Sequence, residues 1–365
     1  MPAPEALVEV DASIEDHGPH PGHRSVVRLV RRVLRADLRA YFGVPTSKSS
    51  GLERVRAHGR LGDVSERIVY SSWQQIDGTW WPGRISQSTY ELDTAVSLEM
   101  VIHYDAAPGQ NVPPEGLEPL PSFARPPSLD VDPKVTVREH SPDIHVIEVP
   151  EADMRVCAVR TSLGLVVLEA PLSSRVGEAV IDALRATLGD VPIAAVVPTH
   201  HHPHPCGGIR AFVHHGAELV GSPHTIEVAR DLVQRPWTLA PDRLARDPRP
   251  LRARPVREAL TLGTGDTRVS IHDIGAASGH TEEYLIACIG DDRLLVEGDL
   301  LRIDPKGRIS GDRLPSLRTA VAEAGWQPAQ LLQTWPLEGV PLHVDASAIT
   351  RPDAVTEKLE PAATP

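Results

Sequence analysis

The sequence has few cysteines, few aromatic residues and no long apolar run. Its three cysteines, Cys157, Cys206 and Cys288, are far apart and odd in number, which argues against a disulfide framework. No apolar stretch is long enough to span a bilayer, and the first residues lack the basic and apolar segments of a signal peptide. These absences predict a cytoplasmic protein in a reducing compartment, with no membrane partner.

Positive charge is also scarce. Lysine occurs only at Lys48, Lys134, Lys306 and Lys358, and 37 Lys and Arg are set against 49 Asp and Glu, for a formal net charge of −12. A general nucleic-acid-binding protein needs a basic surface, so nucleic acid is not an expected partner. The 365 residues, of which 41% are hydrophobic, suffice for two modest globular domains.

The N-terminal part is predicted to be β-rich. Residues 1–23 show no hydrophobic period and are predicted to be mobile, and residues 24–105 are predicted to form a β-rich accessory domain. Within it, Arg24–Phe42 is expected to be an amphipathic helix, although its loose alternation of Val and Arg also suits a strand. Asp77-Gly78 predicts a hairpin. Prolines crowd residues 106–133, which we interpret as a linker, and residues 351–365 are expected to be a mobile C-terminus.

Residues 134–350 alternate between short apolar strands and helical stretches. This order predicts an α/β fold with helices on the outer faces of sheets. A long loop is expected over Arg235–Pro255, which is dense in Pro, Arg and Asp. The predicted strands are Val135–Arg138, Ile144–Val149, Arg155–Val159, Leu165–Leu168, Ile193–Val197, Glu218–Val220, Arg268–Ile274, Tyr284–Ile289 and Leu294–Glu297, and the predicted helices are Arg175–Leu188, Gly208–His215, His224–Gln234 and Leu317–Ala324.

The densest chemical feature is the stretch Thr199–Gly208, at a junction between strand and helix. Four of its residues are histidines within five positions, namely His200, His201, His202 and His204. Imidazole is the commonest metal ligand among side chains, and an extended segment would point His200, His202 and His204 to one face and His201 away. The stretch therefore predicts a metal site, and the alternative interpretation is a polar turn with incidental histidines.

This stretch resembles the hallmark of the metallo-β-lactamase superfamily, His-x-His-x-Asp-His-x-Gly-Gly, at His200, His202, Gly207 and Gly208. Downstream, Ser278-Gly279-His280-Thr281 is similar to the family's Gly-His-Thr segment, and residues 296–301 are similar to its Gly-Asp motif, with Asp299 as the aspartate. The motifs keep the family's order, and the resemblance covers about residues 135–343. It implies an αββα sandwich with the metal at one edge, preceded in some members by an accessory domain.

The departures from the family pattern fall on the second metal site. The Asp and His of that site correspond to His204 and Pro205, and proline has no side-chain ligand atom. The last family histidine corresponds to Pro336, with His343 as an out-of-register substitute, and the early aspartate corresponds to Glu169. The resemblance therefore implies an intact first metal site and an altered second one.

Three histidines with an open fourth position form the ligand set of a catalytic zinc ion. The resemblance gives this set as His200, His202 and His280, and a water in the open position would have its pKa lowered to about 7. Asp299 is expected either to ligate as well or to hold that water for attack; the alternative is that it only caps a turn.

Three further residues near these motifs have candidate roles. His204 is expected to be a general acid or base, and the alternative is that it binds a second ion with Asp299. Glu169 is expected to orient a ligand histidine without touching the metal, unless it is a solvated acid at a strand end. Cys206 could be a soft ligand or a reactive thiol, but packing under the Gly-Gly turn is the preferred interpretation.

The predicted function is therefore a metal-dependent hydrolase with one zinc ion. A metal-activated water would attack an ester, thioester, lactone or amide of a small-molecule substrate. One alternative is a non-hydrolytic metalloenzyme, such as a lyase, cyclase or oxygenase, in which iron would replace zinc. The other is a catalytically silent binding protein that keeps the fold, which the altered second site favours.

Overall fold

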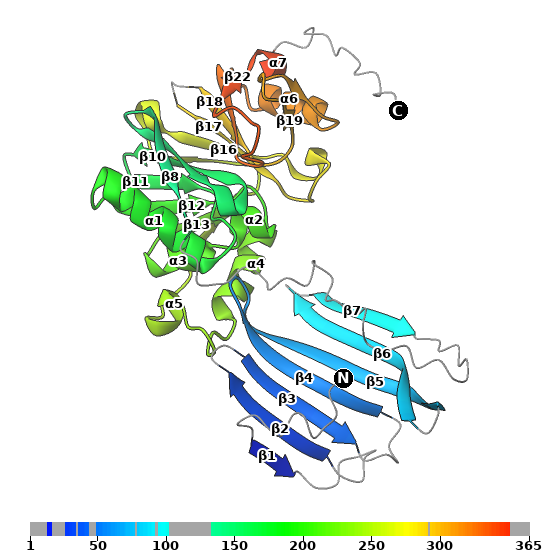
Figure 1. The fold of residues 1–365 in the computed structure, drawn as a ribbon. Helices are drawn as coiled ribbons and strands as arrows, with labels where there is room; N and C mark the ends of the chain where they lie inside the picture. The colour runs from blue at the N-terminus through cyan, green and yellow to red at the C-terminus, as the bar shows by residue number, and fades with distance from the viewer. Residues whose placement is uncertain are drawn as a thin grey trace. The chain divides into compact units, whose positions relative to one another are not determined.

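The computed structural model describes residues 13–16, 26–33, 36–43, 49–76, 79–91, 94–101, 133–290 and 293–350. They fall into two compact units (Figure 1). Unit 1 comprises Met1–Val131 and Arg235–Ala245, and unit 2 comprises Asp132–Gln234 and Arg246–Pro365. Nearly all of the predicted linker, the predicted C-terminal segment 351–365 and most of residues 1–23 lie outside the described residues.

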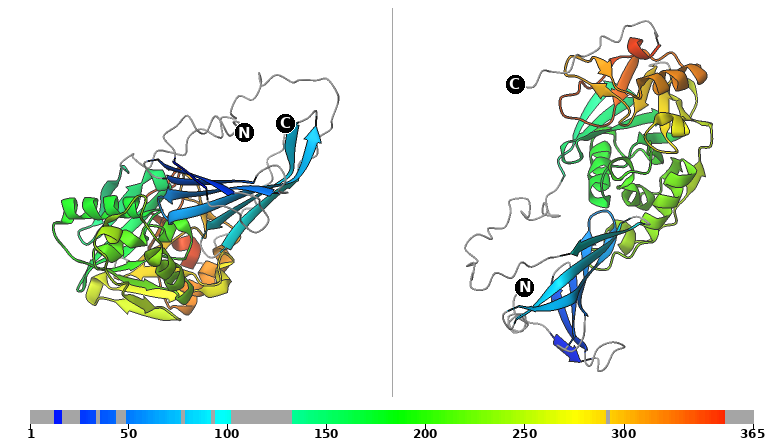
Figure 2. Two further views of the ribbon diagram at one scale, coloured as in Figure 1. Left: turned by 90° about the horizontal axis from the view of Figure 1, so that it is seen from below. Right: turned by 90° about the vertical axis from the view of Figure 1, so that its right-hand side faces the viewer.

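The described residues of unit 1 form an antiparallel sheet whose seven strands pair in chain order, seen as a twisted layer in Figure 2. β5 and β6 pair as far as Ile76 and Thr79, on either side of the predicted Asp77-Gly78 hairpin, whose own two residues lie outside the described ranges. The strands are β1 (Ser13–Asp16), β2 (Val26–Val33), β3 (Ala36–Gly43), β4 (Ser49–His58), β5 (Gly62–Ile76), β6 (Thr79–Glu91) and β7 (Thr94–Val101).

The helix predicted over Arg24–Phe42 is wrong, because β2 and β3 occupy this stretch. The two strands pair antiparallel from Val26 and Gly43 to Val33 and Ala36. The apolar residues here fit a helical and an alternating pattern about equally, but the β-branched valines favour a strand. A neighbouring strand on each side then satisfies the backbone groups. β1 likewise corrects the expectation that all of residues 1–23 lack regular structure.

Unit 2 contains two larger sheets. The first has the order β14-β13-β12-β11-β10-β9-β8, and the second has the order β15-β16-β17-β18-β21-β22. The first sheet is built from β8 (Thr136–Ser141), β9 (Ile144–Val149), β10 (Met154–Thr161), β11 (Gly164–Leu168), β12 (Ile193–Val197), β13 (Glu218–Gly221) and β14 (Ala253–Pro255). The second is built from β15 (Ala259–Leu262), β16 (Val269–Asp273), β17 (Leu285–Ile289), β18 (Leu294–Glu297), β21 (Gln330–Gln333) and β22 (Val344–Asp345).

The two sheets face one another across a shared apolar core. Leu168 and Val197 from the first sheet and Val296 from the second are buried in the same cluster. Alternate residues of the second sheet, such as Ile286 and Leu295, belong to a separate cluster on its other side. This alternation follows from the two-residue period of a strand, and it explains why both faces of these strands are apolar.

Helices cover the two outer faces of the sandwich (Figure 1). α1 (Ser174–Leu188), α3 (Ile209–His214) and α4 (Pro223–Gln234) lie on the first sheet, where α3 contacts β12 and β13 and α4 contacts β13 and β14. α6 (Leu314–Glu323) and the short α7 (Ser347–Thr350) pack on the second sheet through residues such as Leu317 and Ile349. The predicted αββα architecture is therefore confirmed. The remaining elements are α2 (Pro203–Cys206), α5 (Arg243–Arg246) and the ribbon of β19 (Arg302–Ile303) and β20 (Ile309–Ser310).

The stretch predicted as one long loop, Arg235–Pro255, divides between the two units. Its first part belongs to unit 1, where the Asp63 carboxylate accepts hydrogen bonds from the backbone of Thr238 and Leu239 and from the Thr238 hydroxyl. Its end forms β14, an edge strand of the first sheet. An edge position tolerates the proline that made this segment look like a loop.

Candidate metal centre

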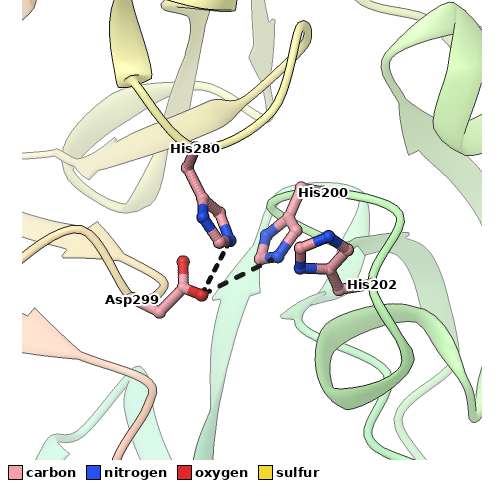
Figure 3. A group of neighbouring side chains, drawn as sticks. All are labelled: His200, His202, His280 and Asp299. Atoms are coloured by element: carbon pink, nitrogen blue, oxygen red, sulfur yellow. Dashed lines mark ion pairs between the residues drawn. The ribbon is translucent and has the colours of Figure 1, made fainter.

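Four side chains from three loops of unit 2 converge at one end of the sandwich (Figure 3). His200 and His202 follow β12, His280 follows the turn after β16, and Asp299 follows β18. One ligand atom from each of the four lies within 4.8 Å of all the others. The imidazole centroids of His200 and His202 are 4.5 Å apart, and those of His202 and His280 are 4.8 Å apart. The structure thus brings together the predicted metal ligands.

The atoms at the centre of this group are suited to a cation. Asp299 Oδ2 lies 3.0 Å from His280 Nε2 and 3.9 Å from His200 Nε2. Both of these nitrogens are buried, and within the described part of the chain neither makes a hydrogen bond of good geometry. Buried polar atoms normally have partners, so such atoms around a carboxylate point to a missing positive charge.

The protonation states of the histidines also favour metal binding. Burial lowers the pKa of His200 to about 2 and also lowers the pKa values of His202 and His280. Neutral imidazoles offer the lone pair that a metal ligand needs. Burial by itself would raise the pKa of Asp299, but the imidazoles of His204, His200 and His280 beside its carboxylate outweigh that effect and keep the pKa well below its usual value.

A buried relay fixes the orientation of His200. The Thr199 hydroxyl donates to Glu169 Oε1 at 2.9 Å and lies 3.1 Å from His200 Nδ1. Because that hydroxyl has given its hydrogen to Glu169, it accepts the Nδ1 proton of His200, and the Nε2 lone pair is left facing the centre. Thr334 donates its hydroxyl to the same Glu169 oxygen at 3.1 Å.

Glu169 is therefore a buried residue behind the ligands and does not reach the metal position itself. It is fully buried, and burial raises its pKa to about 7. Its φ of 80° lies in the left-handed region, which is costly for a side chain larger than glycine. Its backbone N–H bonds Val197 O, so the strained turn ties the end of β11 to the end of β12.

Tyr284 fixes the orientation of Asp299. Its phenol donates to Asp299 Oδ1 at 2.9 Å and accepts from the Asp299 backbone N–H at 2.9 Å. The ring stacks on the His200 imidazole, with centroids 4.9 Å apart and an interplanar angle of 19°. The phenol occupies Oδ1, so Oδ2 is the oxygen that Asp299 presents to the histidines.

Glycines allow the loops of the site to pack closely. A Cβ on Gly207 would lie 2.2 Å from Leu172 O, and one on Gly208 would lie 2.7 Å from Pro171 O. The two loops are also joined by hydrogen bonds from Gly208 N to Ala170 O and from Ala170 N to Pro205 O. The Gly-Gly pair of the histidine motif thus holds the ligand loop against the loop that carries Glu169.

His204 lies next to the group without being one of its four ligands. It is in α2, so the extended geometry predicted for Thr199–Gly208 is wrong beyond His202, where proline at position 203 starts a helical turn. His204 Nε2 still reaches to 3.4 Å from Asp299 Oδ2, and the other side of its ring faces Trp335 at a centroid distance of 5.6 Å. Pro205, the next residue of α2, is buried.

Other predicted candidates lie away from the centre. The His201 ring packs against His224 at 4.4 Å and is not part of the ligand group. His343, the out-of-register substitute ligand, pairs with His140 at 5.2 Å and is exposed. Cys206 is 1% exposed, packed beneath the turn.

Sequence reasoning missed Thr199, Tyr284 and Trp335. Thr199 precedes His200 directly, and a hydroxyl beside a ligand histidine is a signal that could have been used. Tyr284 was assigned only to a strand, and nothing in its local pattern indicates that its phenol bonds a residue 15 positions away.

The pH dependence of the stability of the metal-free protein follows from these buried groups. Burial raises the pKa of Glu169 to about 7 and that of Glu297 to about 8. The stability that these two carboxyl groups contribute is complete at low pH and is lost as the pH rises through these values. The stability that His200 contributes, because its pKa is lowered, is instead lost as the pH falls below its unfolded value near 6.5. Below pH 6.5 the two effects oppose one another, whereas above it only the two carboxyl groups still act, so stability should fall by about 2 kcal/mol between pH 6.5 and 8.

Urea unfolding at several pH values checks this expectation. Glu297→Gln should flatten the decline above pH 6.5, since the amide keeps the acceptor for Leu300 N and cannot ionise. A wild-type protein that gains stability between pH 6.5 and 8 would contradict the assignment of these carboxyl groups.

No protein-family model and no curated protein matches this chain. The search of solved structures gives metallo-β-lactamases. One is a metallo-beta-lactamase from Pontibacter korlensis, with 15% identity and a TM-score of 0.43 over 59% of this chain and 95% of that chain. Another is the DIM-1 metallo-beta-lactamase, with 13% identity and a TM-score of 0.44 over 60% of this chain and 94% of that chain. At these values the similarity says nothing of the metal or the substrate of this chain. In the described ranges, no helix combines the length and apolarity needed to cross a membrane.

Proposed function

We propose that unit 2 is a hydrolase that uses one zinc ion to cleave an ester, thioester, lactone or amide. The observation that carries the proposal is the convergence of His200, His202, His280 and Asp299 on one point. Three imidazoles suit a catalytic zinc ion and leave a fourth position for water or substrate, and Asp299 would either be a further ligand or hold that water. The order of the sequence motifs supports hydrolysis as the reaction class.

The four residues would hold the ion, with His200 ligating through Nε2 because its Nδ1 faces Thr199. When bound, zinc lowers the pKa of a water molecule toward neutrality and polarises a carbonyl oxygen. Thr199 and Glu169 hold the ring of His200, and Tyr284 holds the carboxylate of Asp299. This support reduces the reorganisation needed when the substrate arrives.

His204 is the proposed general acid. Its side chain is 23% exposed, so it is open to solvent while its Nε2 stays 3.4 Å from Asp299 Oδ2. An imidazole in this position can give a proton to the leaving oxygen, sulfur or nitrogen as the acyl bond breaks. Asp299 keeps the ring oriented for that transfer.

One ion is proposed in preference to two. A second ion would need ligands beyond His204 and Asp299. The neighbouring rings of His200 and His202 belong to the first ligand group, and the Trp335 and Pro205 side chains do not ligate. Two ions bound at similar affinity would contradict this part of the proposal.

The test is hydrolysis of p-nitrophenyl acetate and a matching thioester by the zinc-loaded full chain. Turnover should disappear after dialysis against a chelator and return when zinc is added. Turnover that the chelator leaves unchanged would contradict the proposal. Iron-dependent oxygen consumption without ester turnover would indicate the non-hydrolytic alternative, and a zinc-loaded protein that cleaves none of the acyl compounds would indicate a binding protein.

A further inference from the structure

Trp335 is an exposed aromatic residue beside the candidate metal centre. It is 39% exposed, and among the residues whose side chains the structure describes, only it and Leu163 are large, apolar and exposed. Its ring centroid lies 5.6 Å from that of His204, whose Nε2 is 3.4 Å from Asp299 Oδ2. One exposed apolar residue is ordinary, so its significance depends on its position and on how firmly it is held.

The loop that carries Trp335 is fixed to β18 on one side. Trp335 N donates to Gly298 O at 3.0 Å, and Thr334 N donates to Glu297 O at 2.9 Å. These bonds join the indole-bearing residue directly to the backbone that leads into Asp299. The backbone of Trp335 is therefore held at a fixed place beside the metal centre.

The same loop is fixed to β10 on the other side. The Arg155 guanidinium is 2% exposed and donates to the carbonyl oxygens of Gln333, Leu337 and Val340. Asp153 accepts from Leu337 N at 3.0 Å and from Glu338 N at 2.9 Å. Burying a guanidinium costs free energy, which these bonds of Nη1 and Nη2 offset, so breaking them to move the loop would be costly; Nε has no hydrogen-bond partner among the described residues.

The exposed apolar surface at Trp335 has the size of one group of a small-molecule ligand. Leu163 lies in the turn after β10, whereas Asp153 and Arg155 lie at the start of that strand. An eight-residue strand spans roughly 26 Å, so Leu163 and Trp335 do not form one continuous apolar patch. A single rigid indole beside a reaction centre suits one apolar group of a small molecule better than a protein partner.

We propose that Trp335 is the contact surface for the apolar acyl group of the substrate, and that the substrate is an ester, thioester or amide of a medium-length carboxylic acid. The inference rests on the proposed hydrolase function. The acyl carbonyl lies at the metal centre and the carbon chain extends past His204 onto the indole. Trp335 is thus a specificity-determining residue, and compounds with short acyl groups are poor ligands.

The experiment measures how zinc-loaded full-length protein binds n-alkyl hydroxamic acids from two to eight carbons, by calorimetry. The hydroxamate head group binds zinc, so the tail alone varies. The two-carbon compound should still bind, and affinity should rise about two- to fourfold per methylene in the wild type until the indole is covered. Trp335→Ala should remove this dependence, Trp335→Phe should keep most of it, and Leu163→Ala should behave as the wild type.

The outcomes separate this inference from the proposed function, because hydroxamate binding needs no hydrolysis. Chain-length dependence that Trp335→Ala removes supports the acyl contact even if no ester is cleaved. Ester turnover together with a flat hydroxamate series overturns the acyl contact and leaves the hydrolase standing. A preference for alkylammonium compounds over hydroxamates of equal length would assign the indole to a cation and overturn it as well. Trp335→Phe provides the comparison if Trp335→Ala unfolds.

Discussion

The variant His280→Ala should fail to retain zinc and should lose at least about a thousandfold in kcat/KM for ester hydrolysis. Loss of an outer partner of a metal ligand typically costs 10- to 100-fold, so loss of a ligand itself should cost more. His280 Nε2 is 3.0 Å from Asp299 Oδ2, and its removal takes one of the three imidazoles from the ligand group. Zinc titration followed by ester kinetics measures both effects.

His343→Ala is the matched control for this variant. His343 is exposed, packs on His140 and lies outside the ligand group. Its replacement should leave zinc affinity and turnover within about twofold of the wild type, as for surface substitutions in general. A His280→Ala protein that binds zinc as tightly as the His343→Ala protein would show that the four side chains are not a metal site.

Gly298→Ala should disturb the residues that support the metal ligands, with a loss of about 1–3 kcal/mol in stability and roughly 100-fold in zinc affinity. A Cβ at this position would lie 2.3 Å from the Tyr284 phenol oxygen and 2.9 Å from Thr199 Oγ1. Tyr284 is fully buried and stacked on His200, so it has little room to move. The clash would displace the groups that orient Asp299 and His200.

A double variant separates the clash from other effects. Tyr284→Phe removes the phenol oxygen that the new Cβ would meet, so in the Gly298→Ala background it should restore part of the lost stability. Gly189→Ala is the control, since Gly189 has a φ of 77° and no atom within 4 Å of an added Cβ. That variant should lose about 1–2 kcal/mol of stability through its backbone alone and bind zinc normally.

Wild-type zinc affinity in Gly298→Ala would contradict the packing described for Tyr284.

Hydrophobic periodicity was sufficient to predict most elements of unit 2. The expected strands over Ile144–Val149, Ile193–Val197 and Leu294–Glu297 have the same bounds in the structure. Most side chains of these runs are apolar because the strands are buried, and that signal is local. β14 and β21 were missed because short strands take their conformation from their neighbours.

The candidate site also has a part that the sequence could predict and a part that it could not. His200, His202, His280 and Asp299 lie in short motifs that follow strands, so sequence alone could indicate them. The support behind them depends on contacts between distant segments, such as the Thr334 hydroxyl on Glu169, 165 positions away. Trp335 has no local sequence signal, because its exposure and its place beside His204 arise only in the fold.

The metal content of the full-length protein, purified without added metal and measured by elemental analysis, tests the central claim most directly. From the proposed function we expect about one zinc ion per chain in the wild type and none in His280→Ala. Metal-free wild-type protein that does not take up zinc, or two tightly held ions per chain, would contradict the single centre formed by His200, His202, His280 and Asp299.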